Sequence, residues 1–346
     1  MDAHRTGAIG PATLRDVAAA AGVHPATASR ALNPATRSLV NEATAQRVLE
    51  AASGLGYRPN PIARGLKTSR SYTIGVVVPD LRNPLFPPIA RGIEDRLEPA
   101  GYTSLIANTD NEPERERLSF DALSARQVDG FITATARREH PLLREVGAGR
   151  PLVLVNRTSD DDGFPSAVPD DHDGMRRAVE HLAALGHRAI AHVAGPFELS
   201  TGVHRHEGYV RSMESAGLEV DRELVMAGAR FSEDEGARIC RELLARGRRF
   251  TAVLAANDLM ALGCIDALRE AGLDCPRDVS VVGFNDMDWS SRFAPPLTTV
   301  RLPHHRLGVE AAGLLLERLA DPGAPVRHVV LPIELVVRGS TAPAAA

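Results

Sequence analysis

The side chains best suited to contact nucleic acid stand close together near the N-terminus. Thr27, Ser29 and Arg30 carry hydroxyl and guanidinium groups that can reach phosphates or base edges. Pro25 and Ala26 precede them, and the small apolar side chain of Ala26 suits a thymine methyl group. This spacing predicts a short helix whose polar face enters the major groove of DNA.

Two short helices joined by a tight turn are needed to position these side chains. Thr13 is a good N-cap, and an apolar stripe with helical spacing follows it. Gly22 can end the first helix in the left-handed conformation, and Pro25 suits the first turn of the second. The segment therefore predicts a helix-turn-helix, with an ordinary helical hairpin as the alternative. The apolar stripe consists of Leu14, Val17, Ala18 and Ala21.

A third helix and an uneven distribution of charge strengthen this interpretation. Asn41 can cap a helix that ends near Leu55, so three helices can enclose one small core. Residues 1–70 hold nine Arg or Lys against four Asp or Glu, whereas the remaining residues hold 31 against 40. Such asymmetry indicates a nucleic-acid-binding end on an acidic body.

The longer C-terminal part of the chain alternates apolar strands with helices. This rhythm predicts a parallel sheet covered on both faces, and it restarts after Val168. Two such sheets in tandem predict a cleft between two lobes, with ligands bound at the carboxyl ends of the strands. The expected strands are 74–78, 103–108, 130–134, 151–156, 189–195, 224–226, 251–257 and 279–285, and the expected helices are 84–100, 112–125, 175–185 and 205–216.

The sequence lacks the motifs of common catalytic sites. It contains no G-x-S-x-G, no P-loop and no H-E-x-x-H, so we expect neither an enzyme nor a bound cofactor. His204 and His206 lie two positions apart on a predicted helix and project to different sides, which argues against a shared metal. Cys240, Cys264 and Cys275 show neither metal-binding nor disulfide spacing, as is usual in a reduced cytosol.

No segment of the chain has the pattern of a membrane or export signal. A run of about eighteen apolar residues is absent, and the first twelve residues lack the apolar core of a signal peptide. We therefore expect a cytoplasmic protein. The missing signal peptide also argues against an exported binding protein, which the two-lobed body alone would otherwise indicate.

Two N-terminal motifs resemble those of the lactose-repressor (LacI/GalR) family of bacterial transcription regulators. The family pattern T-x-x-D-V-A-x-x-A-G-V-S-x-x-T-V-S-R-x-L-N is followed by G-Y-x-P-N-x-x-A-R-x-L, and both are recognisable here. Later family motifs, including AANDLMALG and DVSVVGFNDMDWSSRFAPPLTTV, extend the match to about residue 341. On these motifs the chain is identified as a member of the family. The matching residues of the first two motifs are Thr13, Asp16, Val17, Ala18, Ala21, Gly22, Val23, Thr27, Ser29, Arg30, Leu32, Asn33, Gly56, Tyr57, Pro59, Asn60, Ala63, Arg64 and Leu66.

The resemblance implies an all-α helix-turn-helix headpiece and an α/β body of the periplasmic-binding-protein type. The body would contain two doubly wound parallel sheets, and the chain would cross between its lobes three times. Such a body binds an effector and forms a homodimer. The implied domains are the headpiece (1–58), a hinge helix (59–70) and the body (71–346), with an N-lobe of about 71–168 and 298–325 and a C-lobe of about 169–297 and 326–341.

The family's DNA contacts carry over onto the headpiece and the hinge. The hinge is too short to form a stable helix in water, so it would fold only on DNA. Leu66 would then wedge into the minor groove of a palindromic operator, with Arg64 and Lys67 beside phosphates. The implied DNA-binding residues are Thr13, Pro25, Ala26, Thr27, Ser29, Arg30, Asn33, Tyr57, Asn60, Ala63, Arg64, Leu66 and Lys67.

The family's effector site carries over onto polar and aromatic residues at the strand ends. Arg205 stands in the T-G-x-x-x-R segment, where the family places an effector-binding arginine. Planar amide, carboxylate and guanidinium groups suit a hydroxyl-rich ligand, and an aromatic ring suits the C–H face of a sugar. A capping or loop-bracing role is the alternative for each residue. The candidates are Asp80, Asn83, Phe86, Asn156, Arg157, Thr201, Arg205, Phe231, Asn257 and Asn285.

Two departures from the family pattern change the charge of this site. Asn285 stands where many relatives have Asp, and several relatives also have Asp at Asn156. The loss of two carboxylates, with Arg157 and Arg205 retained, makes the expected pocket more positive. This favours an anionic or carbonyl-rich ligand, such as a sugar acid or a phosphorylated sugar, over a plain sugar.

These features together predict a ligand-responsive transcription regulator, most simply a repressor. Its operator affinity would be set by a small carbohydrate-like effector in the cleft between the lobes, through allosteric coupling of about 1–3 kcal/mol. An inducer would weaken DNA binding and a co-repressor would strengthen it, and the sequence does not distinguish between these two kinds of effector. A sugar-binding protein for transport explains only the body, and a sugar-modifying enzyme explains neither end of the chain.

Overall fold

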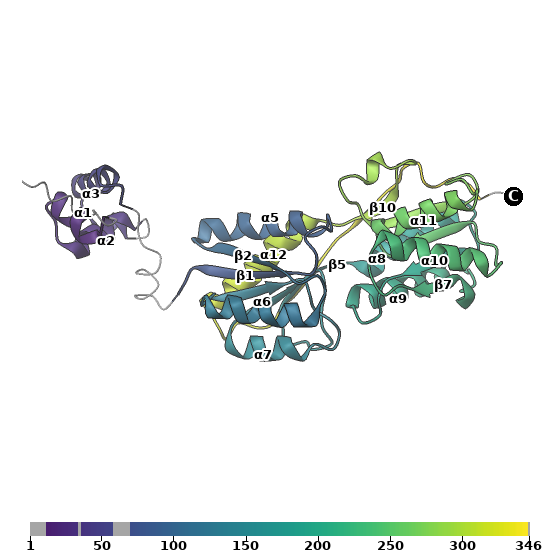
Figure 1. The fold of residues 1–346 in the computed structure, drawn as a ribbon, viewed down its shortest axis with the longest axis horizontal. Helices are drawn as coiled ribbons and strands as arrows, with labels where there is room; N and C mark the ends of the chain where they lie inside the picture. The colour runs from purple at the N-terminus through teal and green to yellow at the C-terminus, as the bar shows by residue number, and fades with distance from the viewer. Residues whose placement is uncertain (1–11, 34–35, 58–69, 345–346) are drawn as a thin grey trace, which may run out of the picture. The chain divides into compact units, whose positions relative to one another are not determined.

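The computed structural model describes residues 12–33, 36–57 and 70–344 (Figure 1). The chain divides into two compact units, Met1–Ser71 and Tyr72–Ala346. The first unit is the helical headpiece and the second is the two-lobed body. Each is described by itself below.

The headpiece contains α1 (Leu14–Ala20), α2 (Pro25–Leu32), a 3-10 turn (Arg37–Leu39) and α3 (Glu42–Gly54). Thr13 and Asp16 form a capping box, in which the Asp16 carboxylate accepts the Thr13 N–H at 2.8 Å. Gly22 has a φ of +63°, which lets the chain turn sharply between α1 and α2. Local sequence signals therefore determine where these helices begin and end.

The core of the headpiece is small and built mainly from alanine. Val17 and Val48 are its largest fully buried side chains, and small residues let the three helices approach closely. Tyr57, Leu14 and Leu32 pack against the margin of this core. The other buried members are Ala18, Ala21, Ala28, Ala31, Ala45 and Ala52.

The described part of the body contains two six-stranded sheets, and the strands follow one another in the same pattern in both. The first sheet has the order β11-β5-β4-β3-β1-β2, and the second has the order β12-β10-β9-β8-β6-β7. All pairings are parallel except that of β10 with β12. The strands are β1 (Thr73–Val78), β2 (Thr103–Asn108), β3 (Gly130–Thr133), β4 (Leu152–Val155), β5 (Ser166–Pro169), β6 (Ile190–Ala194), β7 (Val225–Ala227), β8 (Ala252–Ala255), β9 (Ser280–Asn285), β10 (Thr298–Arg301), β11 (His328–Leu331) and β12 (Glu334–Val336).

Helices cover both faces of each sheet, which explains why the central strands are apolar throughout. In the first lobe α5 and α12 pack together on one face of the sheet, whereas α6 and α7 lie on the other face, α6 against β1 and β2 and α7 against β4 (Figure 1). In the second lobe the packed pairs are α8 with α9 and α10 with α11. The helices are α5 (Phe86–Leu97), α6 (Pro113–Ala125), α7 (Pro141–Gly149), α8 (Asp171–Ala184), α9 (Ser200–Ser215), α10 (Glu233–Ala245), α11 (Asp258–Glu270) and α12 (His304–Ala320).

The contact between α5 and α12 depends on two glycines that face the opposite helix. A Cβ atom at Gly92 would lie 1.9 Å from the carbonyl oxygen of His305, and one at Gly308 would lie 2.0 Å from that of Ile89. Only residues without a side chain permit this approach. The pair joins segments that are more than two hundred positions apart in the sequence.

The predicted fold class is confirmed, but the expected lobe boundaries are wrong near the C-terminus. Residues 298–301 were assigned to the N-lobe, yet β10 pairs with β9 in the second sheet. Residues 328–331 were assigned to the C-lobe, yet β11 pairs with β5 in the first sheet. The chain therefore crosses between lobes after β5, after β10 and after β11. β11 is an edge strand that pairs with β5, far earlier in the chain, whereas β10 lies between β9 and the edge strand β12; these pairings leave no local signal.

Within the described ranges, no helix is both long enough and apolar enough to cross a membrane.

Candidate DNA-binding surface and effector cleft

The helix α2 presents its polar side to solvent. Ala28 and Ala31 are buried in the headpiece core, whereas Arg30 is exposed and Thr27 and Ser29 are half-buried. In the part of the chain that the structure describes, the side chains of Thr27, Ser29 and Arg30 make no hydrogen bond or ion pair. These three groups are therefore available for an external partner.

Both ends of α2 are held by side-chain hydrogen bonds. Before the helix, His24 Nδ1 accepts the Ala26 N–H at 3.2 Å, so His24 caps α2 in place of the usual serine. After the helix, Arg37 Nε donates to the Ala31 carbonyl at 3.0 Å. These bonds satisfy terminal backbone groups and fix the direction of the helix within the headpiece.

The remaining DNA-binding candidates have structural roles or lie outside the described residues. Thr13 caps α1, Pro25 begins α2, Asn33 caps its C-terminus, and Tyr57 packs on the headpiece core. Partial burial raises the pKa of Tyr57. The exposed Ala26 is at the start of α2. The hinge candidates Asn60, Ala63, Arg64, Leu66 and Lys67 lie outside the described residues.

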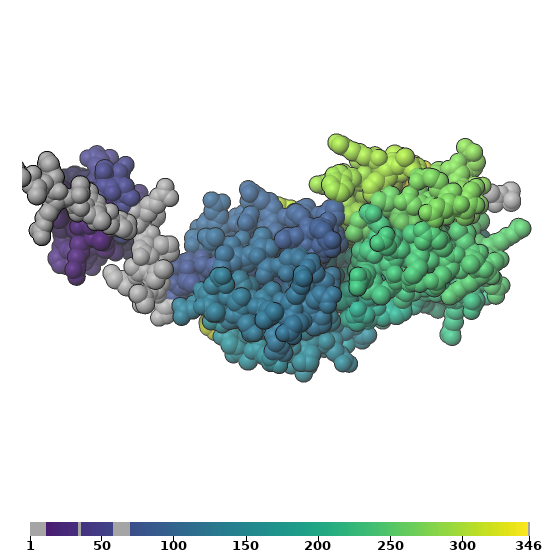
Figure 2. All heavy atoms as spheres, in the orientation of Figure 1, coloured from purple at the N-terminus to yellow at the C-terminus, as the bar shows by residue number. Residues whose placement is uncertain are grey.

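A cleft of about 630 Å³ opens between the two lobes of the body, at the carboxyl ends of strands from both sheets. This volume lies in the range of small-molecule sites. The first lobe contributes the segments that follow β1 to β4, and the second contributes those that follow β6 and β7. Figure 2 shows the largely blue first lobe and the green second lobe meeting along this boundary.

A smaller cavity of about 20 Å³ shares four residues with the cleft. Its volume holds roughly one water molecule. Nine of the ten predicted effector residues line it, and the tenth, Asp80, lines the outer cleft, where its carboxylate pairs with Arg82 Nε at 3.1 Å. The complete lining is Asn83, Leu85, Phe86, Asn156, Arg157, Thr201, Arg205, Phe231, Asn257 and Asn285.

Direct hydrogen bonds join the two lobes of the body. The Arg138 N–H donates to the carbonyl of Glu198 at 2.9 Å, and the Thr158 N–H donates to Ser200 Oγ at 2.9 Å. Each bond joins the end of a first-lobe strand to the region before or at the start of α9. The lobes are therefore in contact beside the cleft.

Arg205 is held rigidly in the second lobe. Its side chain is 2% exposed, and Nε donates to Asp171 Oδ1 at 2.8 Å while Nη1 donates to the Ala256 carbonyl at 2.6 Å. The guanidinium carbon lies 3.9 Å from the ring centroid of Phe284, a cation–π distance. Asp171 is a site-supporting residue that sequence reasoning missed, because nothing near it in the sequence reveals its partner.

Arg157 faces Arg205 from the first lobe but has no such support. It is 6% exposed, and no hydrogen bond or ion pair to it occurs among the described residues, with Nε fully buried and unpartnered. Burial, aided by the nearby charges of Arg205 and Arg137, lowers the pKa of Arg157 to about 10. The group thus stays protonated at neutral pH although burial disfavours its charge.

Three further buried polar atoms in the inner cavity lack a partner in the described structure, namely Asn156 Oδ1, Asn285 Oδ1 and Thr201 Oγ1. Asn156 directly follows β4 and Asn285 ends β9, with φ values of +66° and +120°, which non-glycine residues rarely adopt. Unsatisfied buried acceptors and strained backbone are costly and concentrate at functional sites. These atoms are therefore suited to accept hydrogen bonds from a ligand.

The remaining lining residues divide between apolar walls and local braces. Phe86 is buried, and Phe231 lies against Gly195, where a Cβ atom would clash with its ring. The side-chain oxygen of Asn257 caps α11 by accepting the Met260 N–H at 2.8 Å. The side-chain oxygen of Asn83 accepts the Leu85 N–H at 3.1 Å. The capping alternative thus applies to these two asparagines.

A second buried carboxylate, that of Asp258, follows the lining residue Asn257 directly and was also not predicted from the sequence. It accepts hydrogen bonds from the Met287 N–H and Ser290 Oγ, both at 2.8 Å, and from Thr299 Oγ1. Burial raises the pKa of Asp258 to about 6, although these donors oppose the shift. Asp258 therefore braces the segment that follows Asn285.

The histidines of α9 contact different neighbours, as their spacing predicted. The ring of His204 lies 5.3 Å from that of His172, whereas the ring of His206 stacks 5.7 Å from that of His192. His187 is bound by Thr251 Oγ1 and Ser280 Oγ and joins strands of the second sheet. Over the described residues, no cluster of three His, Cys, Asp or Glu has the arrangement of a metal site.

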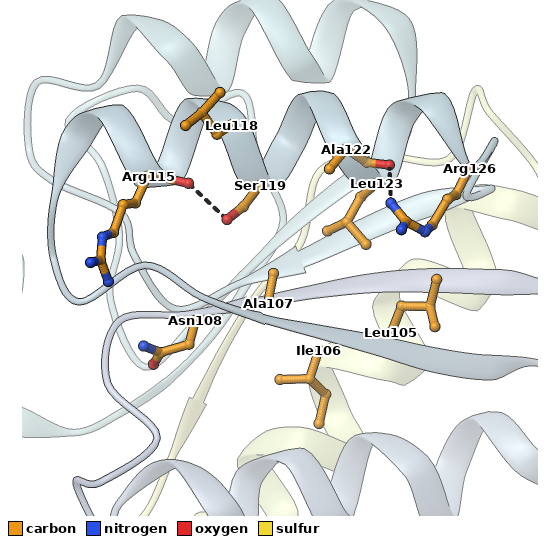
Figure 3. A pocket seen from close by; sticks show the side chains of 10 residues that line it. All are labelled: Leu105, Ile106, Ala107, Asn108, Arg115, Leu118, Ser119, Ala122, Leu123 and Arg126. Atoms are coloured by element: carbon orange, nitrogen blue, oxygen red, sulfur yellow. Dashed lines mark hydrogen bonds between the residues drawn. The ribbon is translucent and has the colours of Figure 1, made fainter.

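Another hollow, of about 500 Å³, lies on the outer side of the first lobe between β2 and α6 (Figure 3). Leu105, Ile106 and Leu118 form most of its apolar surface. Arg126 Nη1 donates to the Ala122 carbonyl at 3.0 Å and thus turns back onto its own helix. No unpartnered buried polar atom lines this hollow in the described structure, so it differs from the cleft between the lobes.

A helix-turn-helix headpiece followed by a two-lobed ligand cleft defines a class, the ligand-responsive DNA-binding regulators. Residues 13–60 match the family described as bacterial regulatory proteins, lacI family. Residues 179–341 match the periplasmic binding protein-like domain. The first match corresponds to the headpiece region, and the second covers most of the second lobe together with α12 and β11 of the first lobe.

Whole-chain relatives agree with these matches. The HTH-type transcriptional repressor PurR of Histophilus somni is 33% identical over 331 residues, covering 95% of this chain and 98% of that protein. The structure of the lac repressor dimer bound to operator and the anti-inducer ONPF has a TM-score of 0.83 at 31% identity, covering 96% and 100%. The complex of the transcriptional regulator CelR with cellobiose has a TM-score of 0.71 at 35% identity, covering 95% and 99%.

The chain therefore belongs to the LacI family and is a helix-turn-helix transcriptional regulator.

Proposed function

We propose that the protein is a repressor whose affinity for its operator is set by a small polyhydroxylated effector bound between the two lobes. The observation that carries this proposal is the group of four unpartnered buried polar atoms around one cavity, contributed by Asn156, Arg157, Thr201 and Asn285. A ligand with several hydroxyl groups satisfies them all at once. The CelR relative binds cellobiose, which supports a carbohydrate-like effector here.

Lobe closure is the step that links the cleft to DNA. Residues of both lobes line the cleft, so an effector that contacts both changes the relative stability of their arrangements. The hinge, 59–70, follows the headpiece directly, and Leu66 is proposed to wedge into the minor groove when the hinge folds. The effector then acts by favouring or preventing the arrangement in which two hinges meet.

The working form is proposed to be a homodimer on a palindromic operator. The lac repressor relative is a dimer bound to its operator, which supports the same assembly for this chain. Two recognition helices related by a two-fold axis read two half-sites in opposite orientation. We place the protein in the cytoplasm, because the DNA that it regulates is there, and we assign it no enzymatic activity, because its relatives are regulators.

Sequence discrimination by α2 tests the DNA-binding proposal. Arg30→Ala should reduce the preference for operator over random DNA by about 1–3 kcal/mol per half-site, because an exposed, unpaired guanidinium reads base edges. Titration of fluorescent operator and of random duplexes at one salt concentration measures this ratio. Arg47→Ala, an exposed arginine of α3, serves as the matched control and should leave it nearly unchanged. An unchanged ratio for Arg30→Ala would contradict the assignment of α2.

A further inference from the structure

The inner cavity contains one uncompensated positive charge. Two arginines line it, Arg157 and Arg205, and no carboxylate residue does. The carboxylate of Asp171 neutralises Arg205 through an ion pair of 2.8 Å. Arg157 is 6% exposed and has no anionic partner among the described residues. Arg157 therefore contributes an unpaired positive charge to the inner cavity, and it also lines the outer cleft, where carboxylates such as those of Asp80, Glu198 and Glu233 occur.

We propose that the effector carries one carboxylate, which binds the guanidinium of Arg157, and that it belongs to the class of sugar acids. The inference rests on the proposed effector role of the cleft and specifies the ligand. A planar carboxylate matches the two parallel N–H donors of a guanidinium, and such paired bonds are the strongest hydrogen bonds available to a buried arginine. The ligand thereby supplies the counter-charge that the folded chain lacks.

The surroundings of Arg157 favour a singly charged group over a phosphate. A phosphate monoester carries a charge between about −1.5 and −2 at neutral pH, which exceeds the one free positive charge. Glu116 and Glu198 lie near enough to raise the pKa of Arg157, and they repel a dianion more strongly than a single carboxylate. Glu116 is buried and already contacts His140 Nε2 at 3.2 Å and Arg137 Nη1 at 3.6 Å. Arg137 is therefore not free to balance a dianion.

The polar atoms around the cavity suit the hydroxyl-bearing part of such an acid, which binds there only if the lobes separate beyond the present volume of about 20 Å³. Asn156 Oδ1 and Asn285 Oδ1 are acceptors without donors, and they stand at the ends of strands from opposite lobes. Ligand hydroxyls donate to both, so that one molecule connects the two lobes. Phe86 and Phe231 provide the apolar walls that suit the C–H face of a sugar ring.

Matched pairs of ligands, titrated into the full-length protein, test whether the effector carries a carboxylate. Each pair differs in the acid group: glucuronate with glucose, galacturonate with galactose, and gluconate with sorbitol, together with glucose 6-phosphate. Calorimetric titration should show at least one acid binding about 10-fold or more tightly than its neutral partner, and more tightly than the phosphate. Arg157→Gln should bring that ratio close to one. Arg144→Gln, which removes an exposed arginine paired with Asp161, should leave it unchanged.

A second measurement does not depend on knowing the effector. Sodium acetate supplies the carboxylate alone, and sodium chloride at the same ionic strength is its control. Acetate should raise the melting temperature of the wild type more than chloride does, and Arg157→Gln should abolish this difference. Arg144→Gln should again behave as the wild type.

Three outcomes overturn the carboxylate proposal. The first is a neutral sugar that binds the wild type more tightly than every acid tested, and the second is an acid preference that survives in Arg157→Gln. The third is the absence of acid binding together with equal effects of acetate and chloride. Each leaves the discrimination measured with Arg30→Ala untouched, so that failure of this inference is distinguishable from failure of the proposed regulator role.

Discussion

The two sides of the cleft hold the same kind of side chain in opposite states. On the second lobe Arg205 has an anionic partner, a backbone acceptor and an aromatic face, supplied by Asp171, Ala256 and Phe284. On the first lobe Arg157 is almost as buried but has none of these among the described residues. The arginine of the second lobe is thus fully paired within the chain, whereas the arginine of the first lobe is not.

This difference distinguishes a polar side chain that stabilises the fold from one that is available to a ligand, although both line the same cavity. A buried charge without a partner lowers stability, and such costly groups concentrate at functional sites. Arg205 has the more familiar position in the family, yet its contacts show that it also braces the second lobe. The following predictions test whether the two arginines differ as this contrast requires.

The largest effect is expected on the side that is already paired. Arg205→Ala should lower the free energy of unfolding by about 3–5 kcal/mol, because it leaves the Asp171 carboxylate buried and alone. Urea unfolding followed by far-UV circular dichroism measures the loss. Arg176→Ala serves as the control, because its ion pairs with Asp173 and Glu180 are exposed at the surface of α8. A loss of less than about 1 kcal/mol is the size expected for the control. Such a result would mean that Arg205 does not stabilise the second lobe and so does not differ from Arg157 in this respect.

An intermediate effect is expected at Asp258, a buried carboxylate without an arginine partner in the described structure. Burial raises its pKa to about 6, above the value of about 3.9 for an unfolded aspartate. The folded chain therefore holds this proton more tightly, and the stability that the group contributes is present below about pH 4 and is lost as pH rises through about 6. Relative to Asp258→Asn, the wild type should gain about 2–3 kcal/mol between pH 7 and pH 4.

Unfolding free energies of both proteins across this pH range check the Asp258 prediction. The difference between wild type and Asp258→Asn isolates this carboxyl from all others that titrate in the same range. Asp266→Asn alters an exposed aspartate of the same helix and should not reproduce the pH-dependent difference. A difference that stays constant from pH 7 to pH 4 would show that the neighbouring donors cancel the effect of burial on the pKa of Asp258.

The smallest effect, and one of opposite sign, is expected at the unpaired arginine. Arg157→Met keeps a straight side chain of similar bulk and removes an uncompensated buried charge, so the unfolding free energy should rise by about 1–2 kcal/mol. Thermal and urea unfolding of the ligand-free protein measure the change. Arg144→Met, at an exposed position of the same lobe, should shift it by less than about 0.5 kcal/mol. Destabilisation by Arg157→Met would mean that this side chain braces the first lobe.

Much of the headpiece and of the cleft could be read from short-range patterns. The capping signals at Thr13 and Asn41 and the glycine at position 22 act within a few residues, so the observed helices begin and turn where these signals stand. The effector candidates came from positions that end apolar strands, and parallel strands bring their carboxyl ends to one edge of a sheet. The resemblance to a known family then selected among those positions.

Other features had no local signature. The strands at 298–301 and 328–331 lie in the opposite lobes from those expected: β11 pairs with β5, far earlier in the chain, and β10 pairs with β9 and β12, and no short-range pattern reveals either set of partners. Asn83 and Asn257 look identical in the sequence to ligand-binding asparagines, yet the structure uses their side-chain oxygens to hold backbone N–H groups. The role of such a residue depends on which donors surround it after folding.

The sequence by itself determined the order of helices and strands, the helix-turn-helix and the presence of two arginines without the expected acidic neighbours, because caps, periodicity and residue type are properties of short segments. Only the tertiary structure decided that Asp171 neutralises Arg205 while Arg157 stays unpaired. Asp171 and Arg205 are separated by 34 positions and meet because α8 packs on α9. Electrostatic partnership depends on distance and burial, and both arise only when the elements pack.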